Sequence, residues 1–236
     1  MLEEKCLTLD IGNTRNKYAI FTNTGEIVRH GGFDDVLDLF ALGDVGSCIY
    51  SQVGGHISDL PNTAIKFNSE LNLPLNIQIN QKHSLGADRL AAVLGVKYKY
   101  GVKNCLVIDA GTCITFDYLL NFNDYEGGAI SPGLKMRFKM LNEHTAALPN
   151  LADVELKGLP LNEIGKNTDD AILSGVVLGV LFEIEERINR FNEQYVDTTI
   201  VLTGGDAAFL ANHIKTRIFV EPLLIHYGLY HAIKSI

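Results

Sequence analysis

The fold is decided by the stretch Leu7-Thr8-Leu9-Asp10-Ile11-Gly12-Asn13-Thr14, in which an apolar run ends in an Asp-x-Gly turn. The β-rich segment Tyr18–Phe21 follows it. An apolar strand, a glycine turn and a second strand predict a β-hairpin. The glycine permits a turn that residues with a β-carbon resist, and such a turn presents main-chain N–H groups that can bind phosphate. A single copy of this motif is equally compatible with an ordinary hairpin whose turn is capped.

The same motif, a strand followed by an Asp-x-Gly turn and a second strand, recurs in the second half of the chain. The apolar run Leu106–Ile108 leads into Asp109-Ala110-Gly111-Thr112, and the β-rich segment 114–119 follows. Each hairpin is followed by a Gly-Gly pair, at residues 31–32 and 127–128. A repeat of this kind predicts two halves with the same opening topology. We therefore expect an N-terminal domain over residues 1–103 and a C-terminal domain over residues 104–236.

Hydrophobic periodicity predicts the remaining elements. We expect strands at Ser47–Tyr50, Leu75–Ile79 and Thr199–Leu202, and helices at about Asp59–Leu71, Ala87–Tyr98, Asp170–Phe191 and a last one ending near Ile233. Asp169 and Asp170 are candidates to cap the long helix. A third glycine turn, Thr203-Gly204-Gly205, lies at a strand-to-helix junction, where free N–H groups favour an anion or a sugar hydroxyl.

Composition narrows the class of protein. Of 236 residues, 47% are hydrophobic and 20% are charged, which is ordinary for a globular chain, and the net charge of −8 disfavours nucleic acid and anionic membranes as partners. The four cysteines form no C-x-x-C pair, so we expect free thiols in a reducing compartment. Glu3 and Glu4 argue against a signal peptide, and the longest apolar stretch, Ala171 to Phe182, is too short to span a bilayer. A cytoplasmic protein is expected.

Taken in order, the motifs resemble the acetate and sugar kinase, Hsc70 and actin superfamily, and within it the type III pantothenate kinases. They span nearly the whole chain, and Gly-Ala-Asp-Arg together with Gly-Gly…Ser-Pro-Gly is the most discriminating part. The matching motifs are Asp10–Thr14 with Lys17, Gly86–Arg89, Ile108–Thr112, Gly127–Gly133, Thr145–Pro149, Asn167-Thr168 and Thr203–Gly205.

This resemblance implies an α/β fold with two ribonuclease-H-like (actin-like ATPase) domains and a nucleotide cleft between them. It implies transfer of the γ-phosphoryl group of ATP to the 4′-hydroxyl of pantothenate, which gives 4′-phosphopantothenate in the first step of coenzyme A synthesis. It also implies Mg²⁺, a monovalent cation (K⁺ or NH₄⁺) and a homodimer. The apolar face of the long helix from Asp170 is our candidate for the dimer contact, with packing inside its own domain as the alternative.

The resemblance also implies roles for particular residues. Asp88 would be the catalytic base, and Asp109 the ligand of the monovalent cation. The substrate contacts would be Gly86, Ala87, Asp88, Arg89 and Thr168. The ATP contacts would be Asp10, Ile11, Gly12, Asn13, Thr14, Arg15, Asn16, Lys17 and Thr112. From residue types alone, Asp88 could accept the proton of an alcohol while Arg89 holds an anionic substrate, but taken by itself Asp88 fits a helix cap better. Thr168 could equally be a helix cap.

One position departs from the family pattern. The tyrosine that the family commonly carries seven residues before Gly86 is Ile79 here, so Asn80 or His83 would have to replace one substrate contact. Two alternative functions stay open. The chain could be a kinase of the same superfamily that acts on another small alcohol or carboxylate. It could also be a non-catalytic, nucleotide-binding transcription accessory factor, although intact Asp10, Asp88 and Asp109 argue against lost catalysis.

Overall fold

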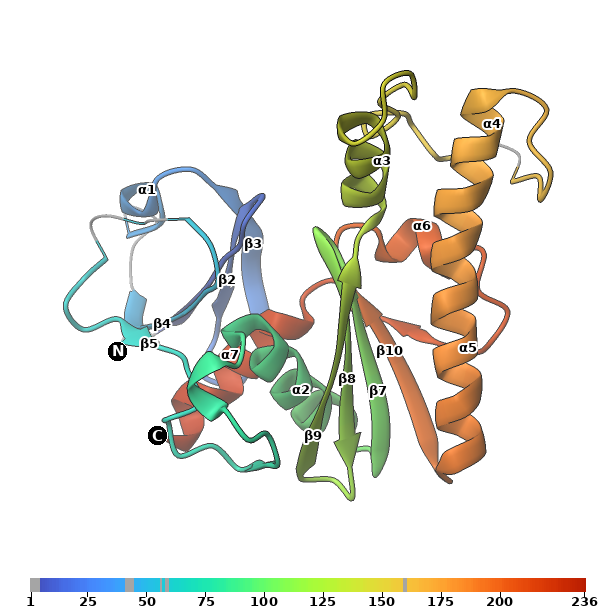
Figure 1. Ribbon diagram of the computed structural model, residues 1–236. Coiled ribbons are helices and arrows are strands. Elements are labelled where there is room, and N and C mark those ends of the chain that lie inside the picture. The colour runs from blue at the N-terminus through green and yellow to red at the C-terminus, as the bar shows by residue number, and fades with distance from the viewer. Residues whose placement is uncertain (1–4, 41–44, 56, 58–59, 159–160) are drawn as a thin grey trace. The chain divides into compact units, whose positions relative to one another are not determined.

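The computed structural model describes residues 5–40, 45–55, 57, 60–158 and 161–236, which form two compact units (Figure 1). The first unit combines the chain up to Val102 with residues 119–127 and 223–236, and the second comprises residues 103–118 and 128–222. The last helix of the chain thus groups with the first unit. The sequence-based division into two ribonuclease-H-like domains, 1–103 and 104–236, stays a prediction.

The first unit is built on a five-stranded sheet of order β3-β2-β1-β4-β5. Strands β1 and β2 form the predicted antiparallel hairpin, β3 pairs antiparallel with β2, and β4 and β5 continue the sheet in parallel. The bounds are β1 Lys5–Ile11, β2 Asn16–Phe21, β3 Ile27–Phe33, β4 Val45–Gln52 and β5 Ile65–Lys66. The predicted strand Ser47–Tyr50 is confirmed as part of β4.

Two helices of the first unit cross at very short range. They are α2, Ala87–Tyr100, and α7, Leu224–Ser235, and the unit also contains α1, Val36–Phe40, and a 3₁₀ turn, Lys82–Ser84. A β-carbon on Gly228 would overlap the carbonyl oxygen of Ala91, so the two backbones touch where this glycine lies. Helix α7 also covers the sheet, because the Tyr230 ring stacks on Phe21 with ring centroids 4.5 Å apart.

The second unit repeats the opening of the first. Its strands follow the order β11-β10-β7-β8-β9, and β7 and β10 are parallel. The bounds are β7 Asn104–Ala110, β8 Cys113–Leu120, β9 Asp124–Pro132, β10 Thr198–Thr203 and β11 Phe219–Val220. The outer end of the β8–β9 hairpin groups with the first unit, where β9 pairs in parallel with β6, Asn76–Ile77. The second predicted hairpin and the strand at Thr199–Leu202 are therefore confirmed.

The long helix predicted from Asp170 is confirmed in extent, and it is not uniform. It consists of α4 Thr168–Leu173, a π-helical segment Ser174–Leu178 and α5 Gly179–Gln194, which Figure 1 shows as one rod. Its cap is Asn167, whose side-chain oxygen accepts a hydrogen bond from the Asp170 N–H at 2.9 Å. The expectation that Asp169 or Asp170 caps this helix was wrong. The unit also contains α3, Leu134–Glu143, and α6, Ala207–Ala211.

The helix predicted over Asp59–Leu71 was also wrong for the part of that segment that the structure describes. Residues 60–71 contain β5 and turns instead. The Phe67 side chain is fully buried, and its N–H donates to the carbonyl of Tyr50 at 2.8 Å. Pairing with β4 therefore outweighs the local helical pattern. The predicted helix over Ala87–Tyr98, by contrast, is α2.

All four cysteines are free, and Cys6, Cys48 and Cys105 are buried, as expected. Burial raises the pKa of Cys48 to about 12, so this thiol stays protonated at neutral pH. Within the described residues, none of the helices is both long enough and apolar enough to traverse a bilayer.

Candidate active site

Asp10 lies near the end of β1 at the centre of the first unit's sheet. It is in register with Lys17 of β2 on one side and with Ser51 of β4 on the other. Only 8% of Asp10 is exposed. A carboxylate so deeply placed must have partners for its charge, because burial without them is costly.

The turn that follows Asp10 is tight and is supported from behind. A β-carbon on Gly12 would lie 3.0 Å from the carbonyl oxygen of Arg15, and one on Gly54 would overlap the Asn13 side chain. The N–H of Val53 donates to the Ile11 carbonyl at 3.1 Å, which fixes the loop after β4 against the turn. The predicted phosphate-binding stretch is therefore held by glycine at two close approaches. Its exposed side chains include those of Asn13 and Thr14.

Asp88 lies in the first turn of α2, whose N-cap is Gly86. One of its carboxylate oxygens accepts a hydrogen bond from the N–H of Arg89 at 2.8 Å. A β-carbon on Gly86 would lie 2.6 Å from that oxygen, so glycine is needed to leave room for the carboxylate. Asp88 thus does take part in the helix start, as its residue type alone suggested, and it remains partly exposed.

Asp10 and Asp88 are close enough to influence each other. Burial raises the pKa of Asp10 to about 6, with attraction to Lys17 opposing the shift and repulsion from Asp88 adding to it. Two neighbouring carboxylates offer a cation a pair of hard oxygen ligands, which Mg²⁺ prefers. The residues present therefore fit a magnesium ion beside the phosphate-binding turn.

The second unit brings together its own three predicted turns. Thr203 is in register with Asp109, and a β-carbon on Gly204, whose φ is +98°, would overlap the Asp109 carboxylate and the Ala110 carbonyl oxygen. The N–H of Gly133 donates to the Thr112 carbonyl at 3.1 Å. Asp109, Thr112 and the Gly204 turn consequently gather at the same edge of the sheet.

Two predicted positions lie elsewhere. Thr168 is the exposed first residue of α4, one position after the residue that caps it. Ile79 packs against Gly127, where an added β-carbon would lie 3.4 Å from the isoleucine side chain. Neither residue lies in one of the turns described above, and their roles stay predictions.

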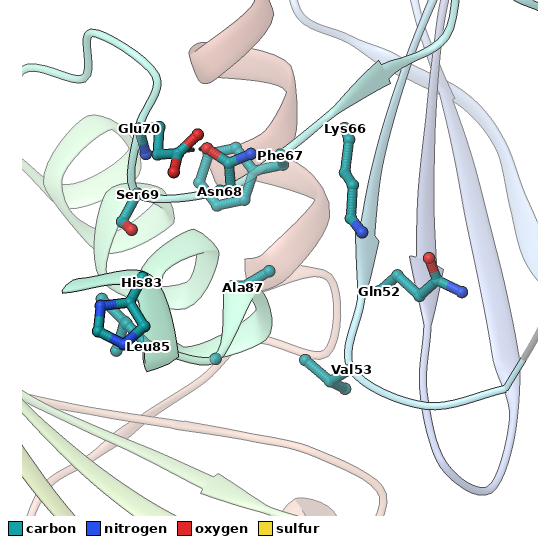
Figure 2. A pocket seen from close by; sticks show the side chains of 11 residues that line it. Gln52, Val53, Lys66, Phe67, Asn68, Ser69, Glu70, His83, Leu85 and Ala87 are labelled. Atoms are coloured by element: carbon teal, nitrogen blue, oxygen red, sulfur yellow. Dashed lines mark hydrogen bonds between the residues drawn. The ribbon is translucent and has the colours of Figure 1, made fainter. Parts of the chain in front are cut away.

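Most of the residues that line a pocket in the first unit were not predicted from the sequence. The pocket has a volume of about 460 Å³ and is bordered by Gly86 and Ala87, directly before Asp88 (Figure 2). Its lining includes Lys66 and Asn68, which fell inside the wrongly predicted helix. Pro61 and the polar turn residues Asn68 and Ser69 were the signals against that helix.

The model of the family described as type III pantothenate kinase matches residues 57–190 of the chain. A curated type III pantothenate kinase of Christiangramia forsetii is 36% identical over 237 residues, covering 94% of this chain and 95% of that protein. The family resemblance drawn from the motifs is confirmed by both findings.

Solved structures show the same fold. A "Baf family transcriptional activator" of Campylobacter jejuni is 26% identical, with a TM-score of 0.63 over 97% of this chain and 98% of that one. The activator of 2-hydroxyisocaproyl-CoA dehydratase of Clostridium difficile, solved with ADPNP, is 15% identical, with a TM-score of 0.55 over 98% and 96% of the two chains. The predicted fold class, two α/β units of the actin-like ATPase type, is confirmed.

Proposed function

Because the chain belongs to the type III pantothenate kinase family, we propose that it phosphorylates the 4′-hydroxyl of pantothenate with ATP, using Asp88 as the base. The observation that carries this proposal is the pair of interacting carboxylates, Asp10 and Asp88, beside a pocket that Gly86 and Ala87 border. The product, 4′-phosphopantothenate, is the first intermediate on the route to coenzyme A.

In the proposed reaction, the 4′-oxygen of pantothenate forms a bond to the γ-phosphorus while the bond to the β–γ bridging oxygen breaks. The proton of the hydroxyl passes to the Asp88 carboxylate, and ADP leaves. Asp88 suits this task because it is partly exposed, and the hydrogen bond from the Arg89 N–H fixes its orientation. Phosphoryl transfer needs mainly positioning and charge neutralisation, which the surrounding groups would supply.

The phosphates are proposed to lie on the turn after β1. The backbone of residues 11–15 supplies N–H groups there, Asn13, Thr14, Arg15 and Asn16 add polar side chains, and Lys17 adds a positive charge beside Asp10. Mg²⁺, when bound, would neutralise charge that develops on the phosphates. Asp10 would hold it, because a buried carboxylate with a raised pKa is stabilised by a nearby cation.

The second unit is proposed to act on the same nucleotide. Thr112 would contact ATP, and Asp109 would hold a monovalent cation, K⁺ or NH₄⁺. The close approach of the Gly204 turn to the Asp109 carboxylate supports this, because main-chain carbonyls and a carboxylate are the oxygen ligands such a cation takes. That both units contact one nucleotide is likewise part of the proposal.

The acceptor is proposed to contact Gly86, Ala87, Asp88 and Arg89, and Thr168 is proposed to complete the site in a homodimer. The long helix buries most of its apolar side chains, such as Val177, Val180 and Ile184, within the chain, which favours packing inside its own domain. The side chain proposed for a dimer contact is therefore that of Phe182 on α5, which is 58% exposed. We place the reaction in the cytoplasm, where ATP is made and free cysteines stay reduced. No nucleic acid or membrane is required as a partner.

The test is a coupled assay of ADP release with pantothenate, with and without K⁺, on the wild type and on Asp88→Asn. We expect the substitution to reduce turnover by about 10²- to 10⁴-fold, the usual contribution of a general base, with ATP binding retained. Asp169→Asn is the matched control, because it removes the same charge from an exposed position at the start of α4.

Full activity of Asp88→Asn would remove the base assignment. Two further outcomes discriminate the alternatives. Turnover with a sugar or acetate but not with pantothenate would identify another kinase of the superfamily. ATP binding without any ADP release by the wild type would identify a nucleotide-binding regulator. The Campylobacter protein is named a transcriptional activator.

A further inference from the structure

Three elements of the second unit meet around one arginine. Arg137, near the start of α3, donates from Nε to the Pro132 carbonyl at 2.8 Å and from Nη2 to the Ser131 hydroxyl at 2.7 Å. The same Nη2 also donates to the Glu183 carboxylate of α5, and the Ser131 hydroxyl donates to that carboxylate at 2.9 Å. Arg137 therefore ties the end of β9 and the start of α3 to the long helix (Figure 1).

These contacts hold the segment that packs on the Thr112 turn, which consists of residues 111 and 112. Gly133 directly follows Pro132, and its N–H donates to the Thr112 carbonyl at 3.1 Å. A β-carbon on Gly133 would overlap the carbonyl oxygens of Gly111 and Thr112, so the two backbones touch with no room for a side chain. A displacement of Pro132 would therefore be passed on directly to the Thr112 turn.

A second arginine contacts the strand that leaves this turn. The guanidinium carbon of Arg187 lies 4.4 Å from the centre of the Phe116 ring on β8, and its Nε lies 3.6 Å from a Glu183 carboxylate oxygen. The Phe116 side chain is fully buried. Glu183 thus anchors two arginines, of which one contacts the segment before α3 and the other the strand after the Thr112 turn.

The contribution of this ion pair is mainly geometric. The side chains of Arg137 and Glu183 are only 24% and 23% exposed. An ion pair removed from water adds little net stability, because the lost hydration of both charges offsets their attraction. A guanidinium, however, directs its donors in one rigid plane, so it fixes several acceptors in place at once. Arg137 therefore sets the positions of Ser131 and Pro132 more than it stabilises the fold.

We propose that Arg137, held by Glu183, is a positioning residue for the nucleotide, because it fixes the Thr112 turn in the conformation that contacts ATP. This inference rests on the proposed function and deepens it by naming residues that act on ATP without touching it. The proposed acceptor contacts, residues 86–89, belong to the first unit, so loss of Arg137 should leave them intact.

The experiment measures the KM for ATP and the KM for pantothenate of the wild type, Arg137→Met, Arg137→Lys and Glu183→Gln. The dissociation constant of ADPNP, an ATP analogue with nitrogen at the β–γ bridge, is measured by calorimetry without pantothenate. Arg190→Met is the matched control, because it removes an arginine that pairs with Glu186 on the exposed side of the same helix. It should change none of these values.

We expect Arg137→Met to raise the KM for ATP and the dissociation constant of ADPNP by about 10-fold, and to change the KM for pantothenate by less than about 2-fold. Arg137→Lys should recover part of the nucleotide affinity, because it keeps the charge without the planar fork. Glu183→Gln should show a smaller rise, since its amide oxygen can still accept from Arg137. Unchanged ADPNP affinity in Arg137→Met would overturn the inference, and so would equal rises in both KM values.

A double substitution tests the route through the turn. When Thr112→Val has already removed the Thr112 hydroxyl, Arg137→Met should weaken ADPNP binding by less than about 3-fold, because residues that act through one contact are not additive. A full 10-fold effect in that background would overturn the inference, because Arg137 would then act on the nucleotide by another route.

The failure of the inference and that of the proposed function are distinguishable. If the wild type binds ADPNP but releases no ADP with pantothenate, the proposed function fails, and the ADPNP titrations still decide the inference. If the wild type releases ADP and Arg137→Met binds ADPNP as tightly as the wild type, the inference alone fails. A wild type that does not bind ADPNP would refute both.

Discussion

Replacing Asp10 with asparagine should stabilise the protein while it abolishes catalysis. Asp10 is buried in the sheet, and its pKa is raised to about 6 from an ordinary value of 3.8. Its ionised form is therefore disfavoured in the folded state. Asparagine has nearly the same shape and carries no charge, so it escapes the cost of burying a carboxylate.

The magnitude follows from the pKa shift. The difference between about 6 and 3.8 is about two pKa units, and each unit is worth about 1.4 kcal/mol, so the ionised carboxylate costs about 3 kcal/mol. The folded state holds the proton more tightly, so this group's contribution to stability is full below pH 3.8 and is lost as the pH rises through 6. The gain from Asp10→Asn should thus be about 3 kcal/mol at pH 7.5 and about half of that at pH 5.

The assay is thermal and urea unfolding of the ligand-free wild type and variant at both pH values. A gain of about 3 kcal/mol corresponds to an increase in Tm of about 6–12 °C for a chain of this size. Asp34→Asn is the control, since it removes the same charge from an exposed position and should change neither value. An Asp10→Asn variant that is no more stable than the wild type at pH 7.5, or a gain that does not depend on pH, would refute the reasoning.

The other predictions concern helix packing and a buried histidine. Gly228→Ala should destabilise the first unit by about 1–3 kcal/mol in urea unfolding, because its methyl group would overlap the Ala91 carbonyl. Gly179→Ala should be neutral or stabilising by about 0.5–1 kcal/mol, because its added carbon would meet no atom within 4 Å beyond the neighbouring backbone of its own helix. Burial, with the charges of Lys17 and His30, lowers the pKa of His226 to about 3, so its contribution to stability should be lost as the pH falls from 6.5, by up to about 1.4 kcal/mol per unit. His226→Asn, measured by urea unfolding from pH 4 to 7, should remove this slope.

Asp10 and His226 act in opposite directions between about pH 4 and 6. Lowering the pH in this range favours the folded state through Asp10 and disfavours it through His226. The wild type should therefore show a flatter stability profile than either Asp10→Asn or His226→Asn. Stability profiles that run parallel for the three proteins would contradict this account. A Gly228→Ala variant that is as stable as Gly179→Ala would contradict the close crossing of α2 and α7.

The features that the sequence predicted well are local ones. A strand, a glycine turn and a return strand are specified by neighbouring residues, and both Asp-x-Gly hairpins and helix α2 formed as expected. The segment at Ile65–Lys66 was mispredicted because its partner, β4, is distant in sequence and the pairing cannot be inferred from local periodicity. A helix cap depends on a single side chain, and the sequence analysis chose Asp169 and Asp170 where the structure has Asn167 as the cap.

In the candidate site too, the local features were predicted and the non-local ones were missed. The ordered glycine motifs singled out Asp10, Asp88 and Asp109, and the resemblance to a family supplied their roles. The electrostatic interaction of Asp10 with Asp88 depends on how α2 lies against the sheet, which no local pattern encodes. The pocket wall with Lys66 and Asn68 was missed for the same reason, because it exists only once β5 is paired.

The placement of α7 in the first unit has a consequence for how the protein is made. A ribosome delivers β1 to α2 first, yet the helix that packs against Ala91 and stacks on Phe21 emerges only after residues 128–222 of the other unit. During synthesis, the face of the first unit's sheet that α7 covers therefore stays exposed until the second unit has been made. Chaperones that shield the growing chain would be needed most during that interval.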